Sequence, residues 1–116
     1  MAIFSVIVIQ IHEFAMNSKI FLSHYTIRSE KSNGINENHL KSWIIEGSND
    51  KSNWKQIDEQ KDCAYLNGSN YAHTFAIKNT SSNESFKYIR LRKTGPNCNN
   101  GCLLLLSALE FYGRII

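Results

Sequence analysis

The sequence predicts an all-β protein, an antiparallel β-sandwich of the jelly-roll type. Short apolar or alternating runs recur along the chain, and polar turns rich in Asn, Ser and Gly separate them. No long stretch repeats apolar residues at helical spacing. A chain of 116 residues with 42% hydrophobic residues has room for one core. We therefore expect a single domain over residues 1–116.

About seven strands are expected. Residues 4–14 are rich in β-branched side chains, which strands prefer. Residues 20–29 alternate, and the alternation puts Tyr25 and Ile27 on one face and Leu22 on the other. The last run, residues 103–113, is apolar on both faces and is expected to be a central strand. The remaining expected strands are residues 40–48, 53–60, 71–79 and 86–94.

The stretch HLKSWIIEGSNDKSNW, residues 39–54, predicts a hairpin. Gly, Asn and Asp in residues 47–50 favour a tight turn between its two strands. Trp43 and Trp54 stand on either side of this turn. We expect both indoles to fill the core, with partners for their N–H groups.

Two charged residues, Arg90 and Glu110, lie in strongly apolar expected strands. A charge in such a place is costly unless it is paired. We expect a structural role, in which Arg90 pairs with Glu110 if their strands are neighbours. The alternative is that Arg90 reaches a ligand from the end of its strand.

The charge pattern argues against nucleic acid as a partner. The net charge is +3, and the 13 Lys and Arg residues are scattered. The apolar residues 1–9 have no Lys or Arg before them and no clear cleavage site after them, and they are too short to span a bilayer. We therefore expect a strand there, an intracellular protein and no membrane insertion.

Reactive residues do not converge in the sequence. The four histidines fall in four different segments, and no metal-ligand spacing, nucleophile elbow or phosphate-binding glycine loop is present. We expect no catalysis, no metal and no cofactor. The three cysteines, Cys63, Cys98 and Cys102, are expected to be free thiols, with a Cys98–Cys102 disulfide as the open alternative.

Five segments, taken together, resemble a known family. IFLSHYTIRS, HLKSWIIEGSND, NWKQID, FKYIRLRKTGPN and LLLSALEFYG occur in the order found in discoidin-like domains, the coagulation factor type C modules of the galactose-binding-like superfamily. The chain is most similar to the branch seen beside BTB/POZ domains and in protist proteins. The resemblance is clearest over residues 9–113.

The resemblance implies a sandwich that binds sugars, lipid surfaces or proteins through loops at one end. The cysteine that secreted members place near the domain's end is missing here, which favours an intracellular protein. Complete members also have more chain before residue 9, so we expect a domain shortened at its N-terminus. Residues 1–8 are candidates to replace part of the first strand.

Two functions follow as hypotheses. The first is a non-catalytic module that binds or tethers a protein partner through the loops. The alternative is a carbohydrate-binding module, because sugar sites combine an aromatic platform with planar polar side chains. The candidate ligand-binding residues are His39, Tyr65, Tyr71, Asn97 and Asn99.

Overall fold

The protein folds entirely from β-strands over the residues described. Its structure is a computed structural model that describes residues 2–7, 11–78 and 84–115. Those residues hold no helix. Their strands are β1 (Ala2–Ile7), β2 (Ile11–Arg28), β3 (Trp43–Ser48), β4 (Lys55–Gln60), β5 (Ala72–Ala76), β6 (Phe86–Lys93) and β7 (Leu104–Ile115).

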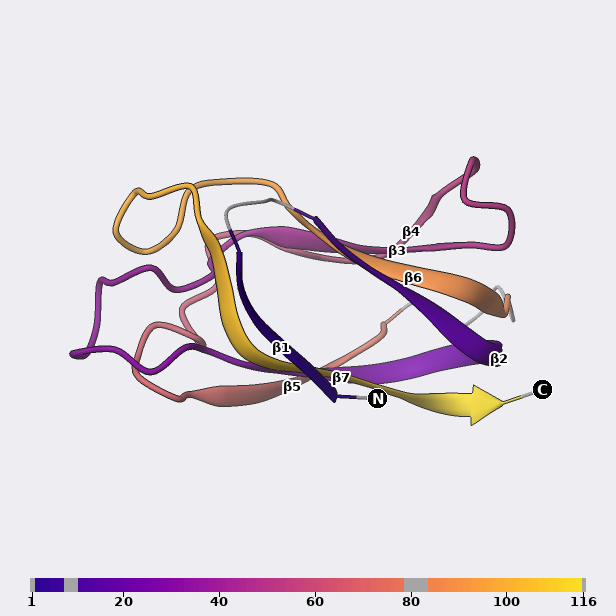
Figure 1. The fold of residues 1–116 in the computed structure, drawn as a ribbon, viewed down its shortest axis with the longest axis horizontal. Helices are drawn as coiled ribbons and strands as arrows, with labels where there is room; N and C mark the ends of the chain where they lie inside the picture. Colours follow the sequence, from indigo (N-terminus) through magenta and orange to yellow (C-terminus); the bar gives the residue numbers. More distant parts are fainter. Residues whose placement is uncertain (1, 8–10, 79–83, 116) are drawn as a thin grey trace.

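Strand β2 joins the two layers of the sandwich. All pairings are antiparallel, and the strand order is β1-β7-β2-β6-β3-β4, with β5 on β2. The first half of β2 pairs with β6, whereas its second half lies between β7 and β5. Figure 1 shows β3, β4 and β6 in one layer, and β5 and β7 in the other. The predicted antiparallel sandwich is confirmed.

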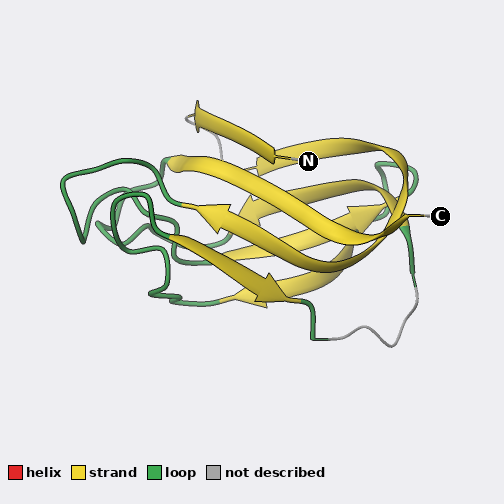
Figure 2. Cartoon of the chain, turned by 90° about the horizontal axis from the view of Figure 1, so that it is seen from below, coloured by secondary structure: helices red, strands yellow, loops and turns green. Residues whose placement is uncertain are grey.

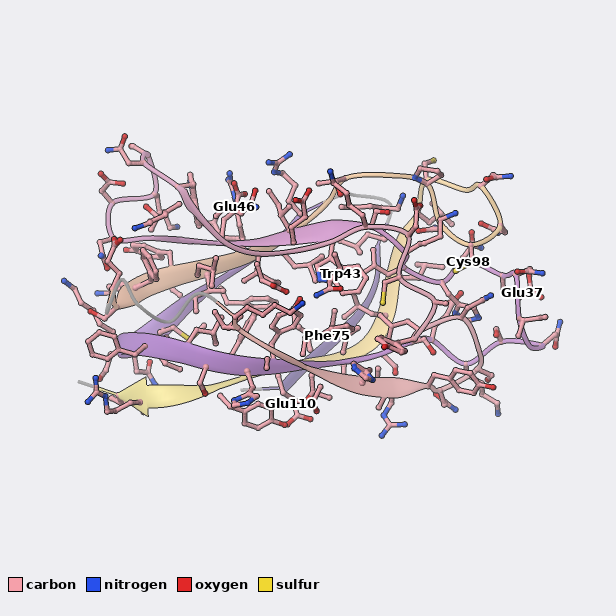
Figure 3. The ribbon with its side chains drawn as sticks, turned by 180° about the vertical axis from the view of Figure 1, so that it is seen from behind. Glu37, Trp43, Glu46, Phe75, Cys98 and Glu110 are labelled. Atoms are coloured by element: carbon pink, nitrogen blue, oxygen red, sulfur yellow. The ribbon has the colours of Figure 1, made fainter. Side chains whose placement is uncertain are left out.

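Aromatic side chains fill the space between the layers. The rings of Trp43 from β3 and Phe75 from β5 meet edge to face at 5.2 Å, and Tyr25 stacks on Phe75 at 5.1 Å. Farther along, Phe14 meets Phe111 at 5.5 Å. Figure 3 shows Trp43 and Phe75 between the two layers. Such ring pairs stabilise the core beyond their burial alone.

A β-bulge in β2 changes which face its side chains occupy, so the predicted faces are wrong. Leu22 was expected on the face opposite to Tyr25, but both side chains are buried. The pairing with β7 shifts between Leu22 and His24, which inserts one extra residue into β2. Because side chains alternate with period two, this insertion turns Leu22 and Tyr25 to the same face.

The predicted hairpin is confirmed, but only one of its tryptophans fills the core. Strands β3 and β4 pair from Trp43↔Gln60 to Gly47↔Lys55. Trp43 is fully buried, and its Nε1 donates to the hydroxyl of Tyr25 at 3.0 Å. Trp54 is partly exposed and lies outside the core cluster. The Arg90 guanidinium stacks 3.9 Å from the centre of its ring instead.

The expected pairing of Arg90 with Glu110 is wrong, because β2 separates β6 from β7. Arg90 Nε donates to Glu46 Oε1 at 2.8 Å, across the β3–β6 pair. Glu110 accepts a hydrogen bond from the Tyr112 hydroxyl at 2.8 Å. Figure 3 places Glu46 and Glu110 on different layers.

Strand β1 makes β7 an internal strand, as its apolar sequence predicted. The pairing runs from Ala2↔Glu110 to Ile7↔Leu104. Residues 2–7 form an edge strand beside β7, whereas their role as a replacement for part of a first strand stays a prediction and residue 8 lies outside the described residues. That the domain is shortened stays a prediction. All three cysteines are free thiols in the structure.

Candidate functional site

Three long loops gather at one end of the sandwich, which we call the loop end. Figures 1 and 2 show them projecting together, away from the β3–β4 turn. The loops are residues 29–42, 61–71 and 94–103. All five candidate ligand-binding residues lie in them.

Backbone hydrogen bonds tie the loops to one another. The amide of Cys63 donates to the carbonyl of Lys41 at 2.8 Å, and the amide of Cys98 donates to the carbonyl of His39 at 3.0 Å. Thr94 N donates to the Ser42 carbonyl at 3.0 Å. The loop of residues 29–42 is thus the frame to which the other two loops attach. A bonded frame of this kind presents surface side chains with little ordering cost on binding.

His39 and Asn97 lie inside this frame, with no exposed surface. His39 Nε2 lies 2.9 Å from the hydroxyl of Ser32 and 3.0 Å from the carbonyl of Gly34. Asn97 Nδ2 donates to the Leu103 carbonyl at 2.6 Å. Their second polar atoms, Nδ1 and Oδ1, have no hydrogen-bond partner. Both side chains therefore hold loops in place, and neither meets solvent.

Asn99 is exposed and bridges two loops. Its Nδ2 donates to Asn38 Oδ1 at 2.8 Å, and its Oδ1 accepts from the amide of Gly101 at 2.9 Å. Both ends of the amide are thus engaged within the protein. A ligand that bonds Asn99 must share or replace these contacts.

Tyr65 forms a flat, exposed aromatic surface. Its side chain is 61% exposed, and its ring stacks on that of His73, with centroids 4.1 Å apart and planes 11° apart. The His73 ring in turn meets the core residue Phe75 edge to face at 4.6 Å. The stack connects a surface ring to the core, and this fixes the ring's orientation.

Tyr71 is the second exposed aromatic of the loop end, at 51%. Its ring lies so close over Gly68 that a Cβ there would stand 2.2 Å from Tyr71 Cε2. Its backbone is fixed as well, because Ser29 N donates to the Tyr71 carbonyl at 2.8 Å and Tyr71 N donates to the Ser29 hydroxyl at 2.9 Å. The absence of a Cβ at Gly68 is thus what allows the Tyr71 ring to lie this close to the backbone.

The predicted residues divide into two groups. His39, Asn97 and Asn99 lie where residues 29–42 meet residues 94–103. Tyr65 and Tyr71 belong to residues 61–71, which precede strand β5. No ring contact or hydrogen bond joins the two groups among the described residues. His73, which supports Tyr65, was not among the predicted site residues. The alternation of residues 71–77 contained that signal, because it placed His73 beside Phe75 on one face.

Charge at the loop end is modest. Burial raises the pKa of Glu30, with His39 acting against the rise and Glu37 adding to it. Burial likewise raises the pKa of the Cys63 and Cys98 thiols, so both stay protonated at neutral pH. The described residues contain no group of three His, Cys, Asp or Glu side chains that could hold a metal.

Cavities lined by described residues lie at both ends of the sandwich. One of 330 Å³ lies beneath residues 94–103, and one of 270 Å³ lies beside the β3–β4 turn. A third, of 430 Å³, is largely apolar and lies at the end opposite to the loops, beside Met16 and Ile115. As for membranes, the described residues include no helix with the length and apolarity to cross one.

Comparison with solved structures identifies the architecture. The C-terminal domain of a chitobiase from Bacteroides fragilis superposes with a TM-score of 0.67 at 18% identity, over 91% of this chain and 64% of that chain. The chain shares the β-sandwich fold of that domain. CpGH89CBM32-5 from Clostridium perfringens, solved in complex with GalNAc-β-1,3-galactose, gives a TM-score of 0.53 at 14% identity, over 87% of this chain and 59% of that one. At these identities the likeness extends to the fold alone.

The sequence is also similar to part of a much longer curated protein. The E3 ubiquitin-protein ligase Ufd4 of Drosophila melanogaster is 28% identical over 108 residues, which are 89% of this chain and 4% of that protein. The chain therefore spans a small fraction of the relative's length. No protein-family model matches the chain.

Proposed function

We propose that the protein is a non-catalytic binding module that docks a protein partner on its loop end. The observation that carries the proposal is the pair of exposed, supported rings, Tyr65 and Tyr71. Tyrosine is enriched at the centres of protein interfaces, and a ring already held in place loses little entropy on binding.

The relationship to Ufd4 supports a role within larger assemblies. The matched segment is a small part of a long ligase, so the likeness concerns one module of that protein. We propose that this chain serves as such a module, of the discoidin-like branch, in an intracellular setting. Recruitment or tethering needs a surface and no chemistry of its own.

Carbohydrate binding is the second candidate. The Tyr65 ring on His73 offers the flat platform on which sugars stack, and CpGH89CBM32-5 has the same fold and was solved with a disaccharide. The polar half of a sugar site is weaker here. His39 and Asn97 are buried, and their hydrogen bonds go to Ser32, Gly34 and Leu103 inside the protein. This favours the protein partner.

Replacement of both rings tests the proposal. Binding partners would be purified with the wild-type protein and with Tyr65→Ala/Tyr71→Ala, and the affinity of the strongest partner measured by calorimetry. We expect the double variant to lose roughly 30-fold in affinity, because truncating an interfacial hot spot costs about 2 kcal/mol. The control is Tyr112→Ala, which removes a ring that is 43% exposed on β7.

The outcomes separate the two candidates. Equal loss in Tyr112→Ala and the double variant would exclude the loop end as the docking surface. Specific binding on a glycan array, abolished by Tyr65→Ala while no protein partner depends on Tyr65, would establish the carbohydrate function instead.

A further inference from the structure

The loop that follows β6 encloses a polar cavity, which we call the Lys93 cavity. It has a volume of 330 Å³ and is lined by residues 92–96, 101 and 102. Thr94, Pro96 and Cys102 are exposed around it, so it opens to solvent. None of the candidate ligand-binding residues lines it. The loop that forms it nevertheless belongs to the loop end.

Lys93 is the unusual residue of this cavity, because its side chain is charged and only 5% exposed. It lies opposite Trp43 in the β3–β6 pairing, which turns it toward the interior. Its ammonium donates to the carbonyl of Gly95. No Asp or Glu of the described residues lies within ion-pairing distance of it. A buried cation that has only a neutral partner is costly.

The neighbouring Arg92 does not compensate for Lys93 and adds little charge to the cavity. Its Nε lies 3.3 Å from Glu46 Oε1 on β3, and that carboxylate already binds Arg90. The cavity therefore holds one positive charge without an acidic partner. Burial lowers the pKa of Lys93, with Cys102 acting in the opposite direction. An anion next to the ammonium would reverse that effect of burial.

We propose that the Lys93 cavity binds a carboxylate group, supplied by an acidic side chain or C-terminus of a polypeptide docked on the loop end. A singly charged carboxylate matches the single ammonium. A doubly charged phosphate needs more donors than this single ammonium supplies. The carboxylate site stands on the cavity alone, whereas the polypeptide source rests on the proposed function.

Cys102 provides a direct probe, because this exposed residue lines the same cavity. Iodoacetate and iodoacetamide alkylate a thiol by the same displacement of iodide, but only iodoacetate carries a carboxylate. We would measure both rates at Cys102 by mass spectrometry in a Cys98→Ser background. A unit charge held close to the reagent is worth about fivefold in the ratio of the two rates. We expect Lys93→Met to lower the ratio by about that factor.

Lys93→Met removes the charge and shortens the unbranched side chain by one atom, and apolar replacement of buried charges is often tolerated. The matched control is Lys61→Met, which removes the same charge from a side chain that is 76% exposed. An unchanged ratio in Lys93→Met, or an equal change in Lys61→Met, would overturn the site. Circular dichroism of each variant checks that the fold is kept.

A second measurement tests the source of the carboxylate. Acetate and an N-acetylated Gly-Glu-Gly peptide would be titrated into ¹⁵N-labelled wild type and Lys93→Met, with sodium chloride at matched ionic strength as control. We expect both probes to shift the amides of Gly95 and Gly101 in the wild type only. Shifts with acetate but not with the peptide would overturn the polypeptide source.

These tests do not depend on the proposed function. An alkylation ratio that depends on Lys93 establishes the carboxylate site even if no protein partner requires Tyr65. Conversely, suppose that a partner requires Tyr65 while the ratio of the two alkylation rates is the same with and without Lys93. That result would support the docking function and contradict the carboxylate site.

Discussion

At the scale of single residues, the two tryptophans show how the same side chain takes different roles. Trp43 is enclosed between the layers and bonded to Tyr25. Trp54 stands just before β4, where it covers the outer side of Arg90 and donates to the Lys51 carbonyl at 3.2 Å. One ring stabilises the core, and the other shields a charge.

Trp43→Ala should lower the free energy of unfolding by about 3–5 kcal/mol, the usual cost of truncating a buried aromatic. Trp54→Ala should cost about 1 kcal/mol, the scale of an exposed cation–π contact. Urea unfolding followed by circular dichroism measures both. Equal losses in the two variants would contradict the different placement of the rings.

The sequence predicted the exposed loop tyrosines better than it predicted the buried polar residues. Tyr65 lies among polar loop residues and Tyr71 at the start of an expected strand, and both are exposed as a ligand-binding role requires, although nothing yet tests that role. The burial of His39 and Asn97 depends on how residues 29–42 and 94–103 meet in space. Contacts between distant loops leave no local pattern in a sequence.

At the scale of elements, the pairing of β6 with β3 decides where the buried charges are satisfied. Glu46 lies opposite Arg90 and accepts hydrogen bonds from both Arg90 and Arg92. Burial would raise the pKa of Glu46, but these two bonds outweigh it and hold the pKa below its ordinary value of 4.5. The ion-pair cluster thus links the two strands through one shared carboxylate.

The same cluster predicts a dependence of stability on pH. Because the pKa of Glu46 is lowered in the folded state, its contribution is present above about pH 4.5 and is lost as the pH falls through the folded-state pKa. Glu46→Gln should cost about 2 kcal/mol at pH 7, the scale of hydrogen bonds to a charged group.

Chemical unfolding of both proteins at pH 7 and pH 3 measures this difference. We expect it to shrink at pH 3, because this pH lies below the ordinary pKa of 4.5, so that the unfolded state binds a proton at Glu46 that the folded state resists. A difference that stays constant between the two pH values would show that the charge of Glu46 is not what stabilises the strands. Glu59→Gln is the control, because Glu59 is exposed on β4.

The presence of strands was predictable from the sequence, but their neighbours and the bounds of the first two were not. Residues 4–14 and 20–29 were expected as separate strands, whereas the structure has β1 over Ala2–Ile7 and one long β2 over Ile11–Arg28. Short apolar runs between polar turns indicated the strands, and the composition of residues 103–113 indicated an internal position. The order of the strands depends on long-range pairing, so the charge pair was assigned to Glu110 and not to Glu46. The bulge of β2 was also invisible, because one inserted residue changes the faces without changing the composition.

At the scale of the whole molecule, the loop end is held by hydrogen bonds between segments far apart in the chain. The amides of Cys63 and Cys98 attach to neighbouring positions of residues 29–42 from two other loops. The loop end should therefore behave as part of the folded body, in contrast to the usual mobility of long loops.

Hydrogen exchange tests this expectation. The amides of Cys63 and Cys98 should exchange slowly, whereas the amide of the exposed Asn36, which donates to the side chain of Asn67, should exchange faster. Asn97→Ala removes the buried bond to the Leu103 carbonyl and should speed exchange at Cys98 more than at Cys63. Rapid exchange at both cysteines in the wild type would contradict a fixed loop end.

The length of β2 also has a consequence for how the protein is made. This strand is synthesised early, yet its pairing partners are β5, β6 and β7, all from the second half of the chain. Until those strands leave the ribosome, the apolar side of β2 has no sheet to join. The nascent chain therefore exposes a long, aggregation-prone strand during translation. A chaperone that binds such strands should raise the yield of folded protein.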